Sequence, residues 1–315
     1  VYKRQATPLP LSDRVDAAAG YAWTSVVRDL PYDWQTLVEN VADPAHVPFA
    51  HHGVQGNRER AAPLPIRMLR EDADLLEAEV NDPSFAMTTR IRFRPPALLE
   101  YRFDLPGDRR MGLVTYCVPT GPGRSRLVAQ FPRNFALRPL RLIPRWWDHA
   151  TNRNAVLDGD AVLLHHQEQE LRRRQRQQQG AAVIWQQAYR LPTSSDRLVI
   201  AFRHWLERCG PLPWQGLPEA PQDARPELLL DRYQQHTLHC SSCRGALAAI
   251  QRLQTAAVVT FAVSLALAAL LPDASRLSLG LPLVLLALAA LAGSAALRFG
   301  LEPRFRYLPY DHSRR

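Results

Sequence analysis

The chain has 315 residues, 46% of them hydrophobic, and a formal net charge of +9 at pH 7. This length allows one large domain with an appendage, and the four cysteines are too few for a secreted disulfide framework, which indicates a reducing compartment. The positive charge suits a membrane surface, an acidic electron carrier or a carboxylate-bearing substrate. The scattered basic residues and the lack of a recognisable module argue against nucleic acid as a partner.

Residues 1–23 are mostly polar and small and are predicted to form a linker, with a first strand just after them. Because the chain begins with Val1 rather than Met, we expect an upstream part to be missing. The first strand leads into a stretch, Asp33–His52, that concentrates residues able to bind metal ions or transfer protons.

This stretch reads DWQTLVENVADPAHVPFAHH and has the apolar periodicity of a helix with one buried side. Its polar residues follow the order Asn-x2-Asp-x2-His-x4-His: Asn40, Asp43, His46 and His51. Asp43 and His46 are expected to share a helix face, and Pro48 to interrupt the helix so that His51 reaches the same point. Two imidazoles can then converge on one metal ion, and the alternative is a helix with hydrogen-bonded histidines and no metal.

Residues 53–65 predict a loop over the entrance of a cavity, or an ordinary surface connection. From Ile66 to about Phe135, short segments alternate between apolar and polar residues and are separated by Gly, Pro and Asp, which predicts an antiparallel sheet. Residues 119–126, PTGPGRSR, have the composition of a hairpin turn.

A long helix is expected from about Leu142 to Gln177, ending in the run RRRQRQQQG, which we interpret as solvated. Asp158 and Asp160 lie inside this segment, where either can bind a metal ion or both can cap a helix. Residues 185–210 then predict a strand, a turn and a second strand that runs into a helix or loop. We expect His204, in this last segment, to pack in the core rather than to bind a metal.

Cys240 and Cys243 form a Cys-x2-Cys motif just after His236 and His239. Three interpretations remain open: a redox-active dithiol, a structural zinc site made by all four residues, or two inert thiols. Two histidines three residues apart and adjacent to both cysteines fit a closed tetrahedron poorly, so the sequence disfavours zinc.

Two uncharged segments, Thr255–Leu271 and Leu279–Leu297, are each close to the ~20 residues that a bilayer core requires. They are apolar on all sides and joined by a short link, which predicts a transmembrane hairpin over residues 251–300 rather than two buried core helices. Arginines precede and follow the hairpin, so both its ends and a tail over residues 301–315 are expected on the cytoplasmic side.

The motif ENVADPAHVPFAHHG resembles the mononuclear-iron site of Rieske-type oxygenases, in particular the branch with pheophorbide a oxygenase and chlorophyllide a oxygenase. CVPTGPGRSRL and the segment YRLPTSSDRLVIAFRHWL resemble the same branch. The resemblance implies an α+β helix-grip (START-like) catalytic domain over residues 24–250. Such a domain has a curved antiparallel sheet wrapped on a long helix, with an apolar cavity.

On this resemblance, a mononuclear Fe(II) ion has three protein ligands: His46, His51 and Asp160. Asp158 is the other candidate for the third ligand. Asp43 would carry electrons from a Rieske [2Fe–2S] cluster in a neighbouring subunit, and Asn40 would support the site. The sequence has no Cys-x-His followed by Cys-x2-His, so we expect the cluster on the missing upstream domain.

The implied activity is the oxidation of a hydrophobic, chlorophyll-derived tetrapyrrole with dioxygen. The implied partners are the membrane, a ferredoxin-like electron donor and further copies of the chain in a trimer. A Cys-x2-Cys motif near the anchor is regarded in this branch as a target of thioredoxin, which favours a redox role for Cys240 and Cys243. The implied location is a thylakoid or plasma membrane, with the catalytic domain on the cytoplasmic or stromal face.

Two functions of other classes remain open. One is a carrier that binds a tetrapyrrole or lipid without chemistry, and the other is a membrane-complex subunit that senses redox state through the Cys-x2-Cys motif. A zinc hydrolase is disfavoured, because no general base is placed as clearly as Asp43 is for electron transfer.

Overall fold

A computed structural model describes residues 9–82, 87–177, 185–209, 214 and 225–312. Residues 1–8 of the predicted linker, 178–180 of the Arg/Gln run and 313–315 of the predicted tail therefore lie outside the described residues. The chain divides into two compact units. The first comprises Val1–Pro144, Asn152–Leu229 and Tyr310–Arg315, and the second comprises Arg145–Thr151 and Leu230–Pro309.

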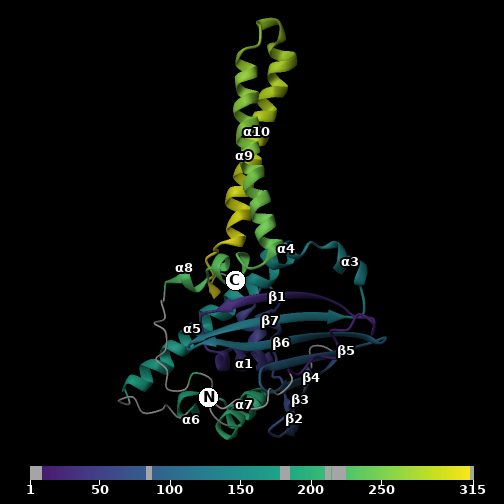
Figure 1. Cartoon of the computed structure of the whole chain (residues 1–315), viewed down its shortest axis with the longest axis vertical. Coiled ribbons are helices and arrows are strands. Elements are labelled where there is room, and N and C mark those ends of the chain that lie inside the picture. The colour runs from purple at the N-terminus through teal and green to yellow at the C-terminus, as the bar shows by residue number, and fades with distance from the viewer. Residues whose placement is uncertain (1–8, 83–86, 178–184, 210–213, 215–224, 313–315) are drawn as a thin grey trace. The chain divides into compact units, whose positions relative to one another are not determined.

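The first unit is built on a seven-stranded antiparallel sheet in the order β1-β7-β6-β5-β4-β3-β2 (Figure 1). The strands are β1 Ala22–Leu30, β2 Ile66–Glu71, β3 Leu76–Asp82, β4 Met87–Arg94, β5 Leu98–Leu105, β6 Arg109–Gly121 and β7 Arg124–Arg133. Six of them form a meander over the part of the chain where the alternating pattern predicts strands. The expected α+β sheet is thus confirmed.

Alternation along the strands decides which side chains enter the core. On β7, Ser125, Leu127 and Ala129 are buried, whereas Arg124 and Arg126 are exposed. The predicted hairpin at residues 119–126 joins β6 to β7, and its turn uses Gly123 at φ +63°, a conformation that glycine adopts without a steric penalty.

Helices pack against this sheet and against one another. Helix α1, Trp34–Ala42, contacts β5, β6 and β7 and also α5, Asn154–Gln177. Glu168 of α5 fixes the start of α1, because its carboxylate accepts from the Asp33 amide (2.6 Å) and the Thr36 hydroxyl (2.8 Å). The long helix expected in a helix-grip fold is therefore attached to the stretch that carries the two candidate histidines.

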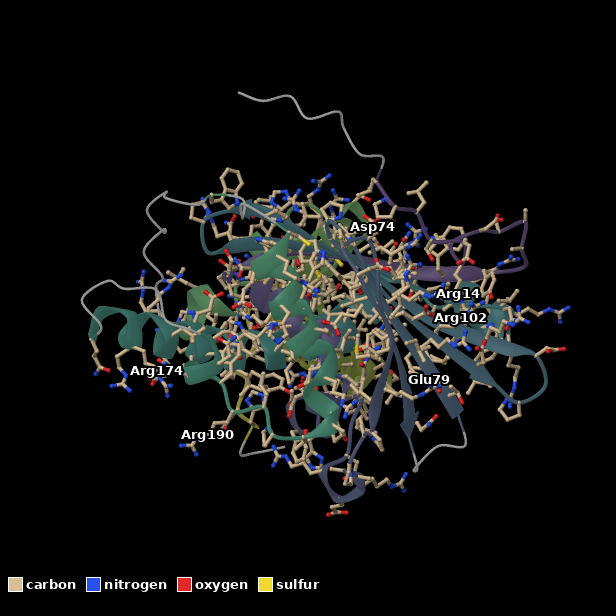
Figure 2. All side chains as sticks on the ribbon, turned by 90° about the horizontal axis from the view of Figure 1, so that it is seen from below. Arg14, Asp74, Glu79, Arg102, Arg174 and Arg190 are labelled. Carbon is tan, nitrogen blue, oxygen red and sulfur yellow. The ribbon has the colours of Figure 1, made fainter. Side chains whose placement is uncertain are left out.

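The single helix predicted from Leu142 to Gln177 is wrong in its first part. The chain forms separate segments there: α3 Leu137–Leu142, α4 Arg145–Asp148, a wide helical turn His149–Arg153 and then α5. Pro144 explains the first break, because the residue before a proline is disfavoured in the helical region and Ile143 is extended. The expected solvated end is confirmed within the described residues, where Arg174 lies at the outer end of α5 (Figure 2).

The segment predicted as two strands is helical. It contains α6 Trp185–Ala188, a turn Ser194–Asp196 and α7 Arg197–Arg208, which packs against β2 and β3. Its apolar residues recur three and four apart, the spacing of an amphipathic helix, and they form its buried side: Leu198, Val199, Phe202, Trp205 and Leu206. His204 falls on the opposite face and is exposed beside Glu207, so the expectation of a core position is also wrong.

The second unit contains two long apolar helices that run side by side in opposite directions (Figure 1). They are α9, Ser241–Ala269, and a longer segment, Asp273–Phe305, that includes α10, Leu281–Ala295. Both are long and apolar enough to cross a membrane. Only 6% and 11% of their most apolar windows are buried within the chain, whereas the core helix of a soluble domain is mostly buried.

Candidate metal centre

The candidate histidines follow α1 on a chain that bends earlier than predicted. Helix α1 ends at Ala42, and Asp43 is extended because Pro44 follows it. A short turn, Pro44–His46, then leads into the four-residue helix Val47–Ala50, where Pro48 occupies one of the first two positions and needs no hydrogen bond. Pro48 therefore starts this short helix, and the break that reorients the histidines lies at Asp43.

Three side chains meet at one point. The Nε2 atoms of His46 and His51 lie 3.1 Å apart, and Oδ1 of Asp160 lies 3.6 Å from the first and 3.3 Å from the second. Ligand bonds of ~2.0–2.2 Å at right angles give separations of about 3 Å, so one ion fits among these atoms.

The ring of His46 is oriented by the backbone. Its Nδ1 makes a short hydrogen bond to the carbonyl oxygen of Asp43. A carbonyl only accepts, so Nδ1 carries the proton and Nε2 offers its lone pair to the cluster. Asp43 also caps the following turn, because its Oδ1 accepts from the Ala45 amide at 2.8 Å. Burial raises the pKa of Asp43, and the nearby His46 and the Ala45 amide partly offset this rise.

Gly159 lets α5 approach the short histidine-bearing helix. A Cβ at this position would lie 2.8 Å from the carbonyl oxygen of Ala50 and 2.8 Å from the Tyr310 hydroxyl. That hydroxyl donates to the same Ala50 carbonyl at 2.9 Å. Ala50 precedes His51 and Gly159 precedes Asp160, so this close approach brings the carboxylate to the imidazole.

Asp158 has a different partner. Its Oδ1 lies 2.6 Å from an Nη atom of Arg28 on β1, and both side chains are 0% exposed. The two carboxylates therefore leave α5 in different directions, since only Asp160 reaches the histidines. Neither is an N-cap, because α5 begins at Asn154.

The cluster has the character of a metal site with neutral imidazoles. Asp160 Oδ1 is buried and makes no hydrogen bond among the described residues; its polar neighbours there are the Nε2 atoms of the two imidazoles, and that of His46 carries no proton. A buried carboxylate oxygen without a donor is costly unless a cation or proton compensates it. Burial lowers the pKa of His51, which favours the neutral ring that metal binding requires.

Other predicted site residues lie differently. Asn40 contributes its backbone carbonyl, which accepts from the Asp43 amide (3.3 Å), and among the described residues its side chain has no bond to the cluster. An apolar cavity of about 760 Å³ is lined by residues that include Leu9, Trp34 and Trp205. No member of the His46 cluster and no residue of the loop over positions 53–65 lines this cavity.

The cysteine motif lies in the second unit, where its partners differ from those expected. Cys240 and Cys243 are near His236, but His239 is exposed, and the second imidazole is that of His149. Sequence reasoning did not consider His149, because it lies 87 residues before His236 in a segment expected to be plain helix.

Comparison with known proteins gives a consistent family. The family model described as pheophorbide a oxygenase matches residues 93–179. The chain is 33% identical to pheophorbide a oxygenase of Oryza sativa, over 99% of this chain and 61% of the rice protein. It is 29% identical to flavonoid 8-hydroxylase 2 of Ocimum basilicum, over 93% of this chain and 58% of that one. The chain therefore spans about 60% of the length of these relatives.

Similarity to solved structures is weaker. Dicamba monooxygenase bound to dicamba is 15% identical, with a TM-score of 0.48 over 64% of this chain and 63% of that chain. A TM-score of 0.48 at 15% identity is too low to support a conclusion about this chain. The family relationship therefore rests on the sequence matches.

Proposed function

Because the chain belongs to the pheophorbide a oxygenase family, we propose that it is the catalytic part of a Rieske-type oxygenase that oxidises a chlorophyll-derived tetrapyrrole. The observation that carries this proposal is the convergence of two imidazoles and one carboxylate: His46, His51 and Asp160. Two histidines and a carboxylate form the facial set used by non-haem iron oxygenases, and this set leaves coordination positions open.

The residues around the ion have separate roles in the proposal. His46, His51 and Asp160 would hold the iron, while the Arg28–Asp158 pair and the Gly159 contact keep α5 in place. Iron at this site would supply the reductive activation of dioxygen for oxidation of the substrate. Asp43 is the entry point for electrons, because its own carbonyl is hydrogen-bonded to the His46 ring. Asn40 remains a supporting residue only by family resemblance.

The electrons would come from a Rieske [2Fe–2S] cluster that this chain does not carry, fed by a ferredoxin-like donor. In the proposal, copies of the chain assemble as a trimer, so that the cluster of one subunit serves the iron of its neighbour. In the proposal, the two apolar helices anchor the protein in a membrane, and the chloroplast location of the relatives makes a chloroplast membrane the first candidate. The proposal assigns the catalytic unit to the cytoplasmic or stromal side, because arginines flank both ends of the helix pair.

A membrane location suits a substrate that partitions into lipid. We take pheophorbide a as the first candidate, since relatives from two plants carry its name at 33% and 31% identity. The relative named as a flavonoid hydroxylase makes a flavonoid the competing ring system. Fluorescence titration of the detergent-solubilised chain with each of the two ligand classes distinguishes a tetrapyrrole from a flavonoid substrate. Preferential binding of the flavonoid would contradict the tetrapyrrole assignment.

The decisive experiment measures iron in the full chain, solubilised in detergent and prepared without oxygen. We expect about one iron ion per chain, lost in His46→Ala and in His51→Ala. His166→Ala is the matched control, because His166 is an exposed histidine on α5 outside the cluster and its loss should leave the iron content unchanged. Absence of iron from the wild-type chain after anaerobic reconstitution would refute the oxygenase and favour a tetrapyrrole carrier or redox-sensing subunit.

Asp43→Asn tests the electron path separately. An Asn side chain can still accept from the Ala45 amide, so the turn should keep its geometry and the iron its ligands. We expect unchanged iron content, but a strongly slowed electron transfer to the iron site and therefore slower product formation when a reduced Rieske protein supplies the electrons. Turnover at the wild-type rate would show that Asp43 does not carry electrons.

A further inference from the structure

A second cluster of metal-binding side chains lies in the second unit, outside the proposed iron site. It has four members: His149, His236, Cys240 and Cys243. They come from three places in the chain: the wide turn His149–Arg153, a similar turn Tyr233–Thr237, and the start of α9. Three of the side chains are buried, and that of Cys240 is half-buried.

The distances within this cluster match the edges of a small tetrahedron. Nδ1 of His149 lies 3.1 Å from Nε2 of His236, 3.4 Å from Sγ of Cys243 and 3.7 Å from Sγ of Cys240. Nε2 of His236 lies 3.3 Å from Sγ of Cys243. A tetrahedral ion with bonds of ~2.0–2.1 Å to nitrogen and ~2.3 Å to sulfur has edges of about 3.3–3.8 Å.

Hydrogen bonds alone account poorly for this arrangement. A ring nitrogen has either one N–H or one lone pair, directed in the plane of the ring, so it satisfies one partner well. Nδ1 of His149 nevertheless has three polar atoms within 3.7 Å. One ion at the centre satisfies all four ligand atoms at once.

We propose that this cluster is a structural zinc site. Two cysteines and two histidines in a closed tetrahedron are the ligands of structural zinc. A Rieske [2Fe–2S] cluster uses the same residue types, but its histidines and cysteines bind different irons. The contacts of 3.3 and 3.4 Å between Cys243 and the two imidazoles leave no room for such a cluster.

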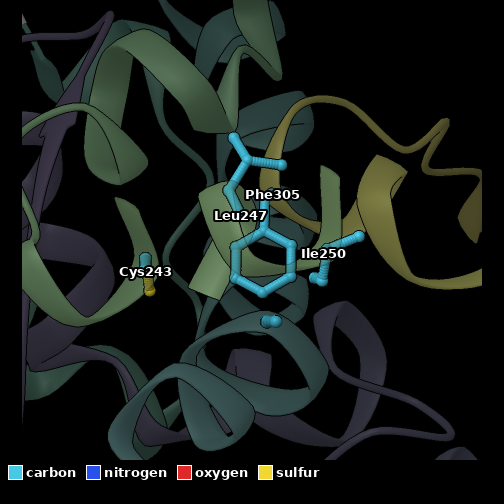
Figure 3. Packing of buried hydrophobic residues seen from close by; sticks show 5 residues of the cluster. Cys243, Leu247, Ile250 and Phe305 are labelled. Atoms are coloured by element: carbon cyan, nitrogen blue, oxygen red, sulfur yellow. The ribbon is translucent and has the colours of Figure 1, made fainter. Parts of the chain in front are cut away.

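The surroundings suit a neutral metal complex. When Zn²⁺ binds, the two thiols release two protons, and two thiolates then balance the charge of the ion. This neutral group borders an apolar cluster to which Cys243 belongs together with Leu247, Ile250 and Phe305 (Figure 3). No additional charge has to be buried.

The segments that supply the ligands are also tied together beside the site. The Thr237 hydroxyl donates to the carbonyl of Phe305 at 2.7 Å, and an Nη atom of the buried Arg232 donates to the carbonyl of Arg304 at 3.0 Å. The same Nη atom lies 3.5 Å from the carbonyl oxygen of Ala150, the neighbour of His149. The zinc would therefore join segments already held at fixed positions, the usual condition for a structural metal site.

The first test uses the wild-type full chain in detergent, purified with a thiol reductant and a small excess of zinc. X-ray absorption at the zinc edge should report two sulfur ligands at ~2.3 Å and two nitrogen ligands at ~2.0–2.1 Å. Elemental analysis should find about one zinc ion per chain. Absence of zinc, a shell of nitrogen and oxygen only, or a Cys240–Cys243 disulfide in its place would overturn the proposal, and the disulfide would support the redox switch.

Variants then separate this site from the proposed iron site. His149→Gln and Cys243→Ser should lose zinc and keep iron, whereas His46→Ala should lose iron and keep zinc. His239→Gln and Cys209→Ser are matched controls, because both residues are exposed and lie outside the cluster. Full retention of zinc by a folded His149→Gln chain would refute the assignment. If that variant does not fold, the ligand count from the wild-type spectrum still decides.

Discussion

Two consecutive residues of β1 form ion pairs on opposite sides of the sheet, which provides an internally controlled experiment. Arg28 points inward and pairs with Asp158 at 2.6 Å, with both side chains 0% exposed. Asp29 points outward and pairs with Arg126 on β7, with exposed fractions of 37% and 46%. The pairs share a strand and differ in burial, and Arg28 also donates to the Asn154 carbonyl at 3.1 Å.

We expect very different costs when each pair is broken. Arg28→Met leaves the Asp158 carboxylate buried without its cation, and losing one partner of a buried pair costs about 3–5 kcal/mol. Arg126→Met removes a solvated pair, which is worth about 0.2–1 kcal/mol. For a unit of about 230 residues, each kcal/mol lowers the melting temperature by about 2–4 °C.

The assay is thermal unfolding of the detergent-solubilised chain, with iron content measured beside it. Because Asp158 lies two residues from Asp160, Arg28→Met should also reduce iron binding, and Arg126→Met should not. The double variant Arg28→Met with Asp158→Leu removes both charges and should recover most of the lost stability. Equal effects of the two single variants, or no recovery in the double variant, would refute the reasoning.

Three further predictions concern the first unit. Gly159→Ala should weaken iron binding about 10- to 100-fold by pushing α5 away from the histidines. Gly293→Ala is the control, because a Cβ there meets open space and should leave iron binding unchanged. Equal iron affinities of the two variants would contradict the role of the close approach at Gly159. Phe202→Ala should cost about 3–5 kcal/mol in unfolding measurements, because this ring packs against three aromatic neighbours, and a cost below 1 kcal/mol would show that the site collapses without a cavity. Burial raises the pKa of Glu39 despite its pairing with Arg203. The free energy of unfolding of the wild type relative to Glu39→Gln should therefore be greatest below pH 4.5 and fall as the pH rises through the raised pKa. A stability difference that grows with pH would contradict this prediction.

The sequence predicted those features that depend on local periodicity. The meander of strands, the hairpin at residues 119–126 and the two apolar helices all follow from patterns within a few residues. The error at α7 has the same origin, since a short apolar run can be interpreted as either a strand or a helix. The buried residues of α7 recur at three- and four-residue intervals, and this spacing was the signal that could have corrected the prediction.

The candidate sites required information from distant parts of the chain. The resemblance favours Asp160 over Asp158 as the third ligand, and the contacts in the fold separate the two: Asp158 pairs with Arg28 on β1, whereas Asp160 lies beside both histidines. The residues around His149 in the sequence do not identify it as a metal ligand. It becomes a candidate ligand because the fold brings it into contact with the cysteine motif. Spacing can identify ligands that lie within a few residues of each other, but it cannot supply those that the fold brings from elsewhere.

The path of the chain between the two units has a practical consequence for anyone who wants a shorter, water-soluble form. The first unit includes Tyr310, which follows the apolar helices in the chain, and its hydroxyl holds the Ala50 carbonyl beside His51. A stop codon after Leu229 would therefore remove part of the histidine environment together with the two apolar helices. Excision of residues 230–309, with a flexible linker to Tyr310, would retain that contact, although His149 would then have lost the residues it meets in the second unit.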